Sequence, residues 1–394
     1  MREYLLVLLI AAATTYLVSG LCRKLALRFG ALARVRDRDV HTIEMPYFGG
    51  LAMLCGLAVA VVVAWQLPFL GAQELVIQDS RAILIAAALI CVVGVLDDIF
   101  ELSALTKFAG QIVAAGVVVA LGVKMLWIPL PGQTIALDNS ASIAITVFFI
   151  VLCANAVNFV DGLDGLATGV VGIGAFAFFA YCYLLTVTQD LTRATTASLV
   201  TVAIAGACLG FLPHNFFPAK MFMGDSGALL LGLLLATSTV SLTGQIDPSQ
   251  MPSDRGLLPT VLPLVLPVAI LALPLLDLVM AYIRRTYQGK WWFAADKQHL
   301  HHRLLERGHS QRGAVMLMYG WSALVSFGMI GLGLVRDRIS LLVAIGLVGL
   351  ALLLLLATLG RPVRGERPVR GERPAGSQRT GRDGSPAKGR RAAH

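Results

Sequence analysis

Charged residues are scarce in this chain, because Asp, Glu, Lys and Arg make up 14% of its 394 residues. A soluble domain carries about 25% charged residues, so the composition excludes a water-soluble globular enzyme and a disordered chain. Cysteine is also scarce, with six residues and no CxxC or zinc-ligand spacing. Most cysteines lie inside apolar runs, which is typical of buried free thiols and not of a disulfide scaffold.

Apolar sequence dominates instead: 57% of the residues are hydrophobic, and the mean hydropathy is +0.77. A membrane-spanning helix needs about 20 mainly apolar residues, and the chain contains eleven such runs. They lie near 4–20, 47–66, 81–96, 108–127, 141–157, 166–187, 195–212, 227–244, 257–283, 313–334 and 339–360. In the first run the positive charges follow the apolar stretch, which favours a retained span with its N-terminus outside over a signal peptide. The sequence predicts an all-α integral membrane protein with about eleven transmembrane helices.

Basic residues divide unequally between the two sides of this predicted bundle. One side holds 25 of the 32 Lys and Arg. Its segments are 21–46, 97–107, 158–165, 213–226, 284–312 and 361–394. The positive-inside rule makes this side cytoplasmic, together with the C-terminus. The net charge of +9 then reflects membrane topology, and we expect no nucleic-acid partner. Residues 1–360 are predicted to form the membrane domain, and 361–394 a basic disordered tail.

Acidic side chains gather at the ends of the predicted spans on the cytoplasmic side. Asp97 and Asp98 end the third span, Asp161 and Asp164 follow the fifth, and Asp225 follows the seventh. Carboxylates at membrane spans are costly and usually functional. Mg²⁺ takes one or two carboxylates together with phosphate oxygens and water, and a further carboxylate can act as a base or nucleophile. These positions therefore indicate a metal-dependent site, with ion pairing or helix capping as the alternative.

Cytoplasmic segment 284–312 supplies the opposite charge. Four of the seven histidines lie from His299 to His309, with Arg303 among them and Lys297 two residues before the first. Such a cluster could clamp a diphosphate, while a zinc site and an amphipathic interfacial helix are the alternatives. Asn215 and Phe222 lie shortly before Asp225, and an amide with an aromatic ring could bind a nucleobase. Core packing is the alternative for the aromatic ring.

Taken in order, these motifs resemble the polyprenyl-phosphate N-acetylhexosamine-1-phosphate transferase family, which moves a phospho-sugar from a UDP-sugar to a lipid phosphate. The resemblance covers about residues 1–360. The matching pieces are Asp97-Asp98 with Lys107 and Gln111, the segments 155–166 and 222–227, and His299-Leu-His-His302. Leu300 in the last motif resembles the branch that transfers GlcNAc-1-phosphate for teichoic acid, O-antigen or arabinogalactan linkers. The phospho-MurNAc-pentapeptide branch usually has three consecutive histidines there. One departure is Tyr47-Phe48 before Gly49-Gly50, where family members often carry a basic residue.

The resemblance implies a role for each candidate residue. It implies Mg²⁺, with Mn²⁺ as a substitute, at Asp225 and Asn158. The implied catalytic carboxylates are Asp97, Asp98 and Asp161, and the implied uridine-binding residues are Asp164, Asn215 and Phe222. The implied diphosphate and sugar ligands are Lys107, His299, His301, His302 and Arg303.

The resemblance also implies a UDP-sugar donor, a polyprenyl phosphate acceptor, and a multi-pass protein in the plasma membrane of a bacterium with its active site facing the cytoplasm. Another UDP-N-acetylaminosugar or UDP-MurNAc-pentapeptide is the alternative donor. A membrane transporter is the alternative class. The acidic residues of transporters usually lie near the middle of the membrane between two structural repeats, whereas the aspartates of this chain are predicted at one edge. The sequence leaves open the oligomeric state, a homodimer included, and the choice between a one-step and a two-step reaction.

Overall fold

The computed structural model describes residues 1–33, 44–130, 133–189, 194–243 and 310–334, with a few isolated positions. These residues belong to one compact unit, Met1–Arg361. Several predictions lie outside the described residues. They concern the spans 257–283 and 339–360, the residues His299, His301, His302 and Arg303, and the tail 361–394.

Nine helices make up most of the described part of the chain. They are α1 (Arg2–Phe29), α2 (Gly49–Ala64), α3 (Glu74–Phe100), α4 (Ala104–Ala120), α5 (Asn139–Val160), α6 (Leu166–Gln189), α7 (Ala194–Asn215), α8 (Gly224–Thr243) and α12 (Gln311–Leu334). Seven are long and apolar enough to cross a membrane, and α2 and α4 are shorter apolar helices. The described residues thus form an all-α membrane protein. Nine of the predicted spans coincide with these nine helices.

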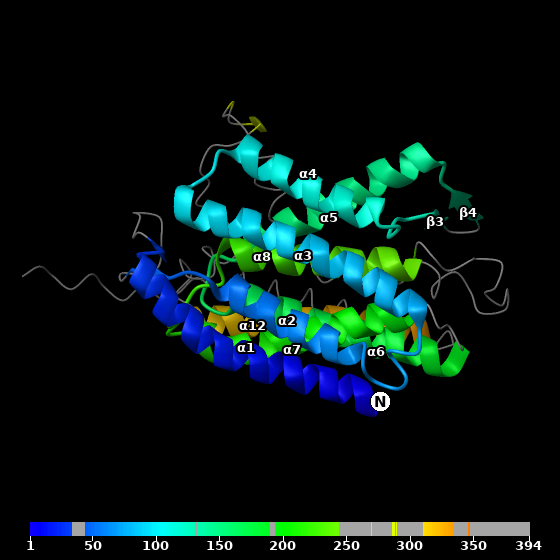
Figure 1. The fold of residues 1–394 in the computed structure, drawn as a ribbon, viewed down its shortest axis with the longest axis horizontal. Coiled ribbons are helices and arrows are strands. Elements are labelled where there is room, and N and C mark those ends of the chain that lie inside the picture. Colours follow the sequence, from blue (N-terminus) through cyan, green and yellow to red (C-terminus); the bar gives the residue numbers. More distant parts are fainter. Residues whose placement is uncertain are drawn as a thin grey trace, which may run out of the picture. The chain divides into compact units, whose positions relative to one another are not determined.

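Helix α8 is the central helix of the described bundle. It packs against α2, α3, α5 and α7, with α4 beyond α3 and α5 and with α1 beyond α2 and α7 (Figure 1). The apolar segment of α8, which is long enough to span a membrane, is buried along its whole length. A helix that is apolar on all sides is buried by its neighbours. Several hydroxyls of α8 bond to its own backbone. Ser238 and Thr239, for example, donate to the carbonyls of Leu234 and Leu235.

Glycines let two helices approach the first turn of α8 closely. A Cβ on Gly50 of α2 would lie 2.2 Å from the backbone nitrogen of Gly227. A Cβ on Gly94 of α3 would lie 2.3 Å from the Cα of Ser226. Small residues of this kind bring helix backbones together in membranes, where packing and polar contacts replace the hydrophobic driving force. The start of α8 is therefore held tightly between α2 and α3.

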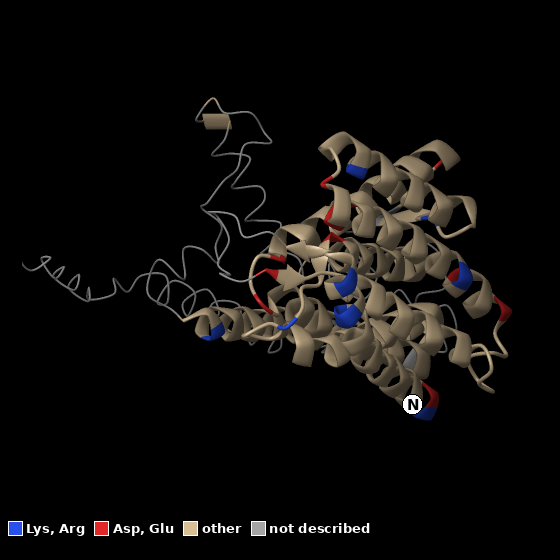
Figure 2. Ribbon diagram, turned by 60° about the vertical axis from the view of Figure 1, so that its left-hand side comes forward, with Lys and Arg blue, Asp and Glu red and all other residues tan. Residues whose placement is uncertain are grey.

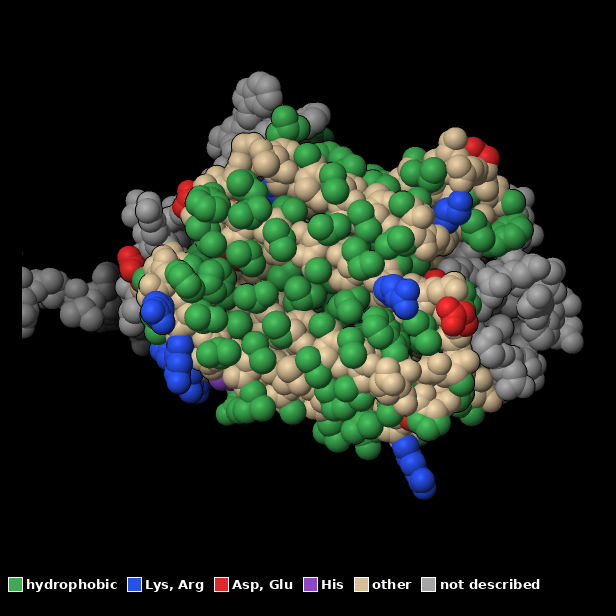
Figure 3. All heavy atoms as spheres, viewed as in Figure 1, with side chains coloured by type: hydrophobic (Ala, Val, Ile, Leu, Met, Phe, Trp, Pro, Cys, Tyr) green, Lys and Arg blue, Asp and Glu red, His purple; other side chains and the backbone are tan. Residues whose placement is uncertain are grey.

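Apolar side chains cover the outside of the bundle between its two ends. Figure 3 shows hydrophobic side chains over most of the visible face, with charged side chains toward the ends, and Figure 2 shows charged positions near the ends of helices. Leu17 of α1, Val92 of α3 and Val113 of α4 are among the large exposed apolar residues. Their exposure is what a lipid-facing surface requires.

Two short antiparallel strand pairs depart from the all-helical prediction. The span expected over 108–127 ends at Ala120, because Gly122 adopts a φ of +100° and turns the chain out of the helix. Strand β3 (Trp127–Leu130) then pairs with β4 (Gln133–Ala136), and Ile128 lies opposite Ile135. Strand β1 (Leu32–Ala33) likewise pairs with β2 (Met45–Pro46). The helical prediction is wrong for residues 121–127, whereas the other strand residues lie between the predicted spans.

Candidate active site

The end of α3 and the start of α4 place three charged side chains close together. Helix α3 ends at Phe100, and the next residue, Glu101, adopts a left-handed backbone conformation one turn after Asp97. Helix α4 starts almost at once, because the Ser103 hydroxyl accepts a hydrogen bond from the Thr106 amide and caps the new helix. Lys107 therefore follows within the first turn of α4 and lies opposite the carboxylates of α3.

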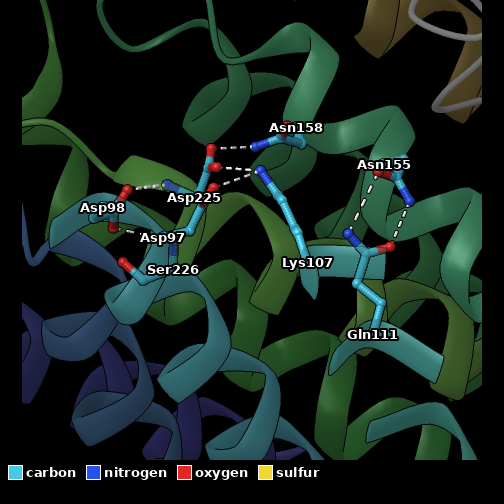
Figure 4. Close-up of polar contacts among 8 residues, drawn as sticks. All are labelled: Asp97, Asp98, Lys107, Gln111, Asn155, Asn158, Asp225 and Ser226. Atoms are coloured by element: carbon cyan, nitrogen blue, oxygen red, sulfur yellow. Dashed lines mark hydrogen bonds and ion pairs between the residues drawn. The ribbon is translucent and has the colours of Figure 1, made fainter. Parts of the chain in front are cut away.

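Lys107 joins two carboxylates from different helices. Its Nζ lies 2.9 Å from Asp97 Oδ2 and also donates to Asp225 Oδ2 in the first turn of α8. Asn158 of α5 donates from Nδ2 to the other oxygen of Asp225 at 2.5 Å (Figure 4). The structure thus places Lys107, which the resemblance implied as a diphosphate and sugar ligand, between the carboxylates of Asp97 and Asp225. The ligand role stays a prediction.

Asp98 contacts the backbone at the start of α8. Its Oδ1 accepts from the Asp225 amide at 2.8 Å, and its Oδ2 accepts from the Ser226 amide at 3.3 Å. Gly224 adopts a φ of +71°, and a Cβ there would lie 2.5 Å from Asp98 Oδ2. Because a carboxylate at a helix N-terminus satisfies free amides and interacts favourably with the helix dipole, this contact fixes the position of Asp225. The catalytic role predicted for Asp98 stays a prediction.

Asp161 lies in the turn directly after α5 and is partly buried. Burial, followed by the negative charges of Asp225, Asp98 and Asp164, raises the pKa of Asp161 to about 8. A carboxyl group surrounded by other carboxylates indicates a region that would bind a cation favourably.

Two predicted uridine-binding residues join the turn after α5 to the segment before α8. Asp164 Oδ2 accepts from the Ala219 amide at 3.0 Å. Asn215 is buried, accepts from the Thr168 hydroxyl at 2.7 Å and donates to the Met221 carbonyl at 3.1 Å. The structure thus brings Asp164 and Asn215 into one region, but it uses the Asn215 amide within the protein. A direct uridine contact by Asn215 stays a prediction.

Phe222, the third predicted uridine-binding residue, lies beside the chain that precedes α2. Its amide donates to the Pro46 carbonyl at 3.0 Å, and its carbonyl accepts from the Gly49 amide at 3.2 Å. These bonds explain why the Gly49-Gly50 motif belongs near the site, since a side chain on Gly49 would collide with the Phe222 carbonyl.

Sequence reasoning missed two residues of α12 that contact the same region. Tyr319 donates from its hydroxyl to the Gly165 carbonyl at 2.5 Å, in the turn that carries Asp161 and Asp164. The Arg312 guanidinium lies 5.5 Å from the ring centre of Phe217. No motif marked either residue, because a tyrosine inside an apolar run and an arginine at its start are both common at membrane interfaces.

The described residues fit a magnesium site that substrate would complete. Among them, no group of three or more His, Cys, Asp or Glu could hold a metal ion without help. Mg²⁺ does not need such a group, because it usually binds one or two carboxylates together with substrate phosphates and water. Asp97 and Asp225 already share the cationic Nζ of Lys107, which shows that the carboxylates are placed around a positive charge.

Comparison with known proteins agrees with this picture. The glycosyl transferase family 4 model matches residues 80–243. The chain is 46% identical over 333 residues to a decaprenyl-phosphate N-acetylglucosaminephosphotransferase of Mycobacterium tuberculosis, covering 83% of this chain and 82% of that relative. It is 34% identical over 316 residues to a probable undecaprenyl-phosphate N-acetylglucosaminyl 1-phosphate transferase of Bacillus subtilis, covering 79% and 80%. A phospho-N-acetylmuramoyl-pentapeptide-transferase of Desulforudis audaxviator is 34% identical over 241 residues, which cover 54% of this chain and 68% of that relative.

The fold and the site define a multi-pass membrane protein with a cluster of carboxylates at one end of its helical bundle. Together with the identity over most of both chains, they assign the class of membrane-bound sugar-phosphate transferases. The chain belongs to glycosyl transferase family 4, within its polyprenyl-phosphate N-acetylhexosamine-1-phosphate transferases.

Proposed function

We propose that this protein transfers GlcNAc-1-phosphate from UDP-GlcNAc to a polyprenyl phosphate. The observation that carries the proposal is the 46% identity, over 83% of the chain, to a relative named for decaprenyl phosphate and N-acetylglucosamine phosphate transfer. In this reaction an oxygen of the lipid phosphate bonds to the β-phosphorus of UDP-GlcNAc. The bond from that phosphorus to the bridging oxygen breaks, UMP leaves, and polyprenyl-diphosphate-GlcNAc begins a cell-envelope polysaccharide.

The carboxylate cluster suits this chemistry, because phosphoryl transfer depends mainly on positioning and on charge neutralisation. Asp225 and Asn158 are the residues proposed to hold Mg²⁺ or Mn²⁺, which would neutralise diphosphate charge when bound. Asp97 is proposed to accept a proton from the lipid phosphate. Lys107, which pairs with Asp97, supplies positive charge beside the transferred group. Asp98 positions Asp225 through the α8 backbone.

The residues around the turn after α5 are proposed to bind the donor. Asp164 and Phe222 bind uridine in this proposal, and Asn215 shapes their surroundings through its bonds to Thr168 and Met221. Asp161 remains the third catalytic carboxylate, and its surroundings favour a bound cation. The diphosphate and sugar are assigned to the cluster His299, His301, His302 and Arg303, on the sequence alone.

We also propose eleven spans, with the N-terminus outside and the carboxylate cluster at the cytoplasmic face of a bacterial plasma membrane. The support is the 25 of 32 basic residues on that side and the alternating direction of successive helices. The alternation brings the end of α3, the end of α5 and the start of α8 to one end of the bundle. A homodimer remains an open part of the proposal.

A donor panel on purified protein tests the function. With decaprenyl phosphate as acceptor, we expect UMP release from UDP-GlcNAc and little from UDP-MurNAc-pentapeptide, because a site that hydrogen-bonds one donor can reject another by orders of magnitude. The pentapeptide donor is the second candidate, since the Desulforudis audaxviator relative is 34% identical to this chain. Asp225→Asn serves as the inactive control for each donor.

Each outcome of the panel decides one point. Equal turnover of the two donors would overturn the choice of GlcNAc and retain the reaction class. Absence of UMP release with every UDP-sugar would overturn the reaction class and favour a transporter.

His301→Ala should lower kcat far more than it weakens uridine binding. A pure loss of UDP affinity would move the histidine cluster into the nucleotide site.

A further inference from the structure

Two side-chain amides bridge α4 and α5 one helical turn beyond Lys107. Asn155 donates from Nδ2 to Gln111 Oε1 at 2.6 Å, and Gln111 donates from Nε2 to Asn155 Oδ1 at 3.4 Å (Figure 4). Asn155 also donates to the Val151 carbonyl of its own helix at 2.8 Å, which fixes the orientation of its amide. Gln111 is 1% exposed, so its amide depends on Asn155 and not on water.

The spacing along each helix ties this pair to the carboxylate cluster. Gln111 follows Lys107 by four residues on α4, and Asn155 precedes Asn158 by three residues on α5. Residues three or four apart lie on the same helix face. Lys107 and Asn158 both reach Asp225. The amide pair and the contacts to Asp225 are therefore successive polar connections along one helix interface.

Helix α4 needs such a connection more than α5 does. Helix α5 packs directly on the buried helix α8, whereas α4 packs on α3 and α5 and turns Phe108, Ile112 and Val113 outward. Apolar contacts between helices in lipid set the axial register weakly, while interhelical hydrogen bonds set it specifically. A slip of one residue would move Lys107 by about 1.5 Å along the helix axis. An error of about 1 Å in a catalytic group can cost about 100-fold in rate.

We propose that the Gln111–Asn155 pair is a positioning pair: it fixes the register of α4 against α5 and so holds the Lys107 ammonium group on Asp97 and Asp225. We assign to neither amide a contact with substrate. The activity readout of this proposal rests on the proposed function. The pair acts through Lys107, because Asn158 and Asp225 are held by the direct packing of α5 on α8.

Matched apolar variants separate positioning from stability. Gln111→Met and Asn155→Leu keep the shapes and remove the hydrogen bonds. Each single variant leaves one buried amide unpaired, so we expect a lower Tm and a kcat reduced by about 10- to 100-fold, with the KM for UDP-GlcNAc changed by less than about threefold. The double variant removes both amides, so its Tm should return toward that of the unaltered protein while kcat stays low. If kcat returns together with Tm, the pair is merely structural and the proposal is wrong.

Three further variants sharpen the test. The exchanged pair Gln111→Asn with Asn155→Gln keeps the total side-chain length, and its kcat should exceed that of the double apolar variant by about tenfold. In a Lys107→Met background, Gln111→Met should change kcat by less than about twofold, because two substitutions that act through the same ammonium group do not have additive effects on the activation free energy. If the two single-variant losses of kcat instead multiply in the double variant, the proposal is wrong.

Ser80→Ala is the control, because it removes the hydrogen-bond partner of Trp65 Nε1 and should lower Tm without changing kcat.

A titration with Mn²⁺, followed by electron paramagnetic resonance, needs no catalytic activity. If Lys107 competes with a bound cation for Asp225, a misplaced Lys107 competes less. Gln111→Met should then tighten Mn²⁺ binding in the same direction as Lys107→Met and by a smaller factor. An unchanged Kd would overturn the positioning role. Failure of the unaltered protein to release UMP from any donor would overturn the proposed function and leave the pair to be judged by this titration.

Discussion

Three aspartates of the site differ in what their carboxylates contact. Asp225 meets the Lys107 ammonium group and the Asn158 amide, whereas Asp98 meets backbone amides at the start of α8. Asp161 has other carboxylates as its charged neighbours. Because the surroundings of a carboxylate decide its charge and its chemistry, these three residues should respond differently to substitution.

Asp225→Asn should abolish transfer while the protein still folds. The amide keeps the shape of the side chain, but it removes the negative charge proposed to bind Mg²⁺, and metal-ion catalysis is worth several kcal/mol. UMP release measured at saturating Mg²⁺ checks the expectation. EDTA should inactivate the unaltered protein, and Mg²⁺ or Mn²⁺ should restore it. Residual activity above about a tenth of the unaltered rate would contradict the metal assignment.

Lys107→Met should tighten Mn²⁺ binding although it lowers transfer. The Lys107 ammonium group contacts the Asp225 carboxylate, so a second cation must compete with it. Charges about 4 Å apart near a protein surface interact by about 4 kcal/mol, so removing the competitor should tighten Mn²⁺ binding by about tenfold or more. Lys124→Met is the matched control, because Lys124 donates to Asn139 on another part of the chain. Unchanged or weaker Mn²⁺ binding would show that the ammonium group does not occupy the cation site.

Asp161→Asn should change how the stability of the metal-free protein depends on pH. Because the pKa of Asp161 is raised to about 8, the folded protein holds a proton that the unfolded chain releases near its usual pKa of about 4. The free energy of unfolding therefore falls as the pH rises between these two values. Asparagine does not ionise, so the variant should lose less stability over this window. Thermal unfolding in detergent with EDTA at pH 5, 7 and 9 measures the difference, and parallel curves would refute the expectation.

At the scale of helices, the site depends on close packing around the first turn of α8. Gly50 and Gly94 let α2 and α3 approach the backbone of Ser226 and Gly227. Asp98, four residues after Gly94 on the same face of α3, then reaches the α8 amides. Packing and capping therefore position Asp225 together.

Gly94→Ala should weaken both the fold and the reaction. The new Cβ would lie 2.3 Å from the Cα of Ser226, so α3 and α8 would have to separate, and overpacking typically costs about 1–3 kcal/mol. The shift would also move Asp98 away from the α8 amides, so kcat should fall. Gly116→Ala on α4 is the control, because its Cβ meets nothing within 4 Å and should be neutral or slightly stabilising. Equal Tm values for the two variants would contradict the packing argument.

Hydropathy predicted the described helices well, because a helix that faces lipid or a buried interface needs a continuous apolar run. It failed over 121–127, where Gly122 ends α4 and a strand follows, because apolar residues suit either element. The gathering of Asp97, Asp161 and Asp225 was also predictable from alternating spans. Their partners were not, because Lys107 and Asp225 lie 118 residues apart and no local pattern specifies which helices touch.

At the scale of the whole molecule, the described helices share one pattern. Apolar side chains cover most of the visible face of the bundle (Figure 3), while the proposed catalytic residues Asp97, Asp161 and Asp225 lie at or next to helix ends. Helices α3, α4 and α5 run in alternating directions (Figure 1), so the end that carries Glu101, between α3 and α4, is opposite the end that carries Ser140, at the start of α5. The distribution of basic residues makes the Glu101 end cytoplasmic in our proposal. This orientation would expose the site to a water-soluble nucleotide donor and leave the lipid acceptor in the bilayer.

Glu101→Cys and Ser140→Cys test that orientation, because both positions are exposed and lie at opposite ends of the bundle. In intact cells a membrane-impermeant maleimide should label Ser140→Cys and should leave Glu101→Cys unlabelled until the membrane is opened. The six native cysteines lie within helices, five of them buried, so a cysteine-free background should be obtainable by substitution with alanine or serine. Labelling of Glu101→Cys in intact cells would place the carboxylate cluster on the outer face. That result would separate the site from a cytoplasmic UDP-sugar and would overturn the proposed topology, while leaving the contacts of Lys107 with its two carboxylates unaffected.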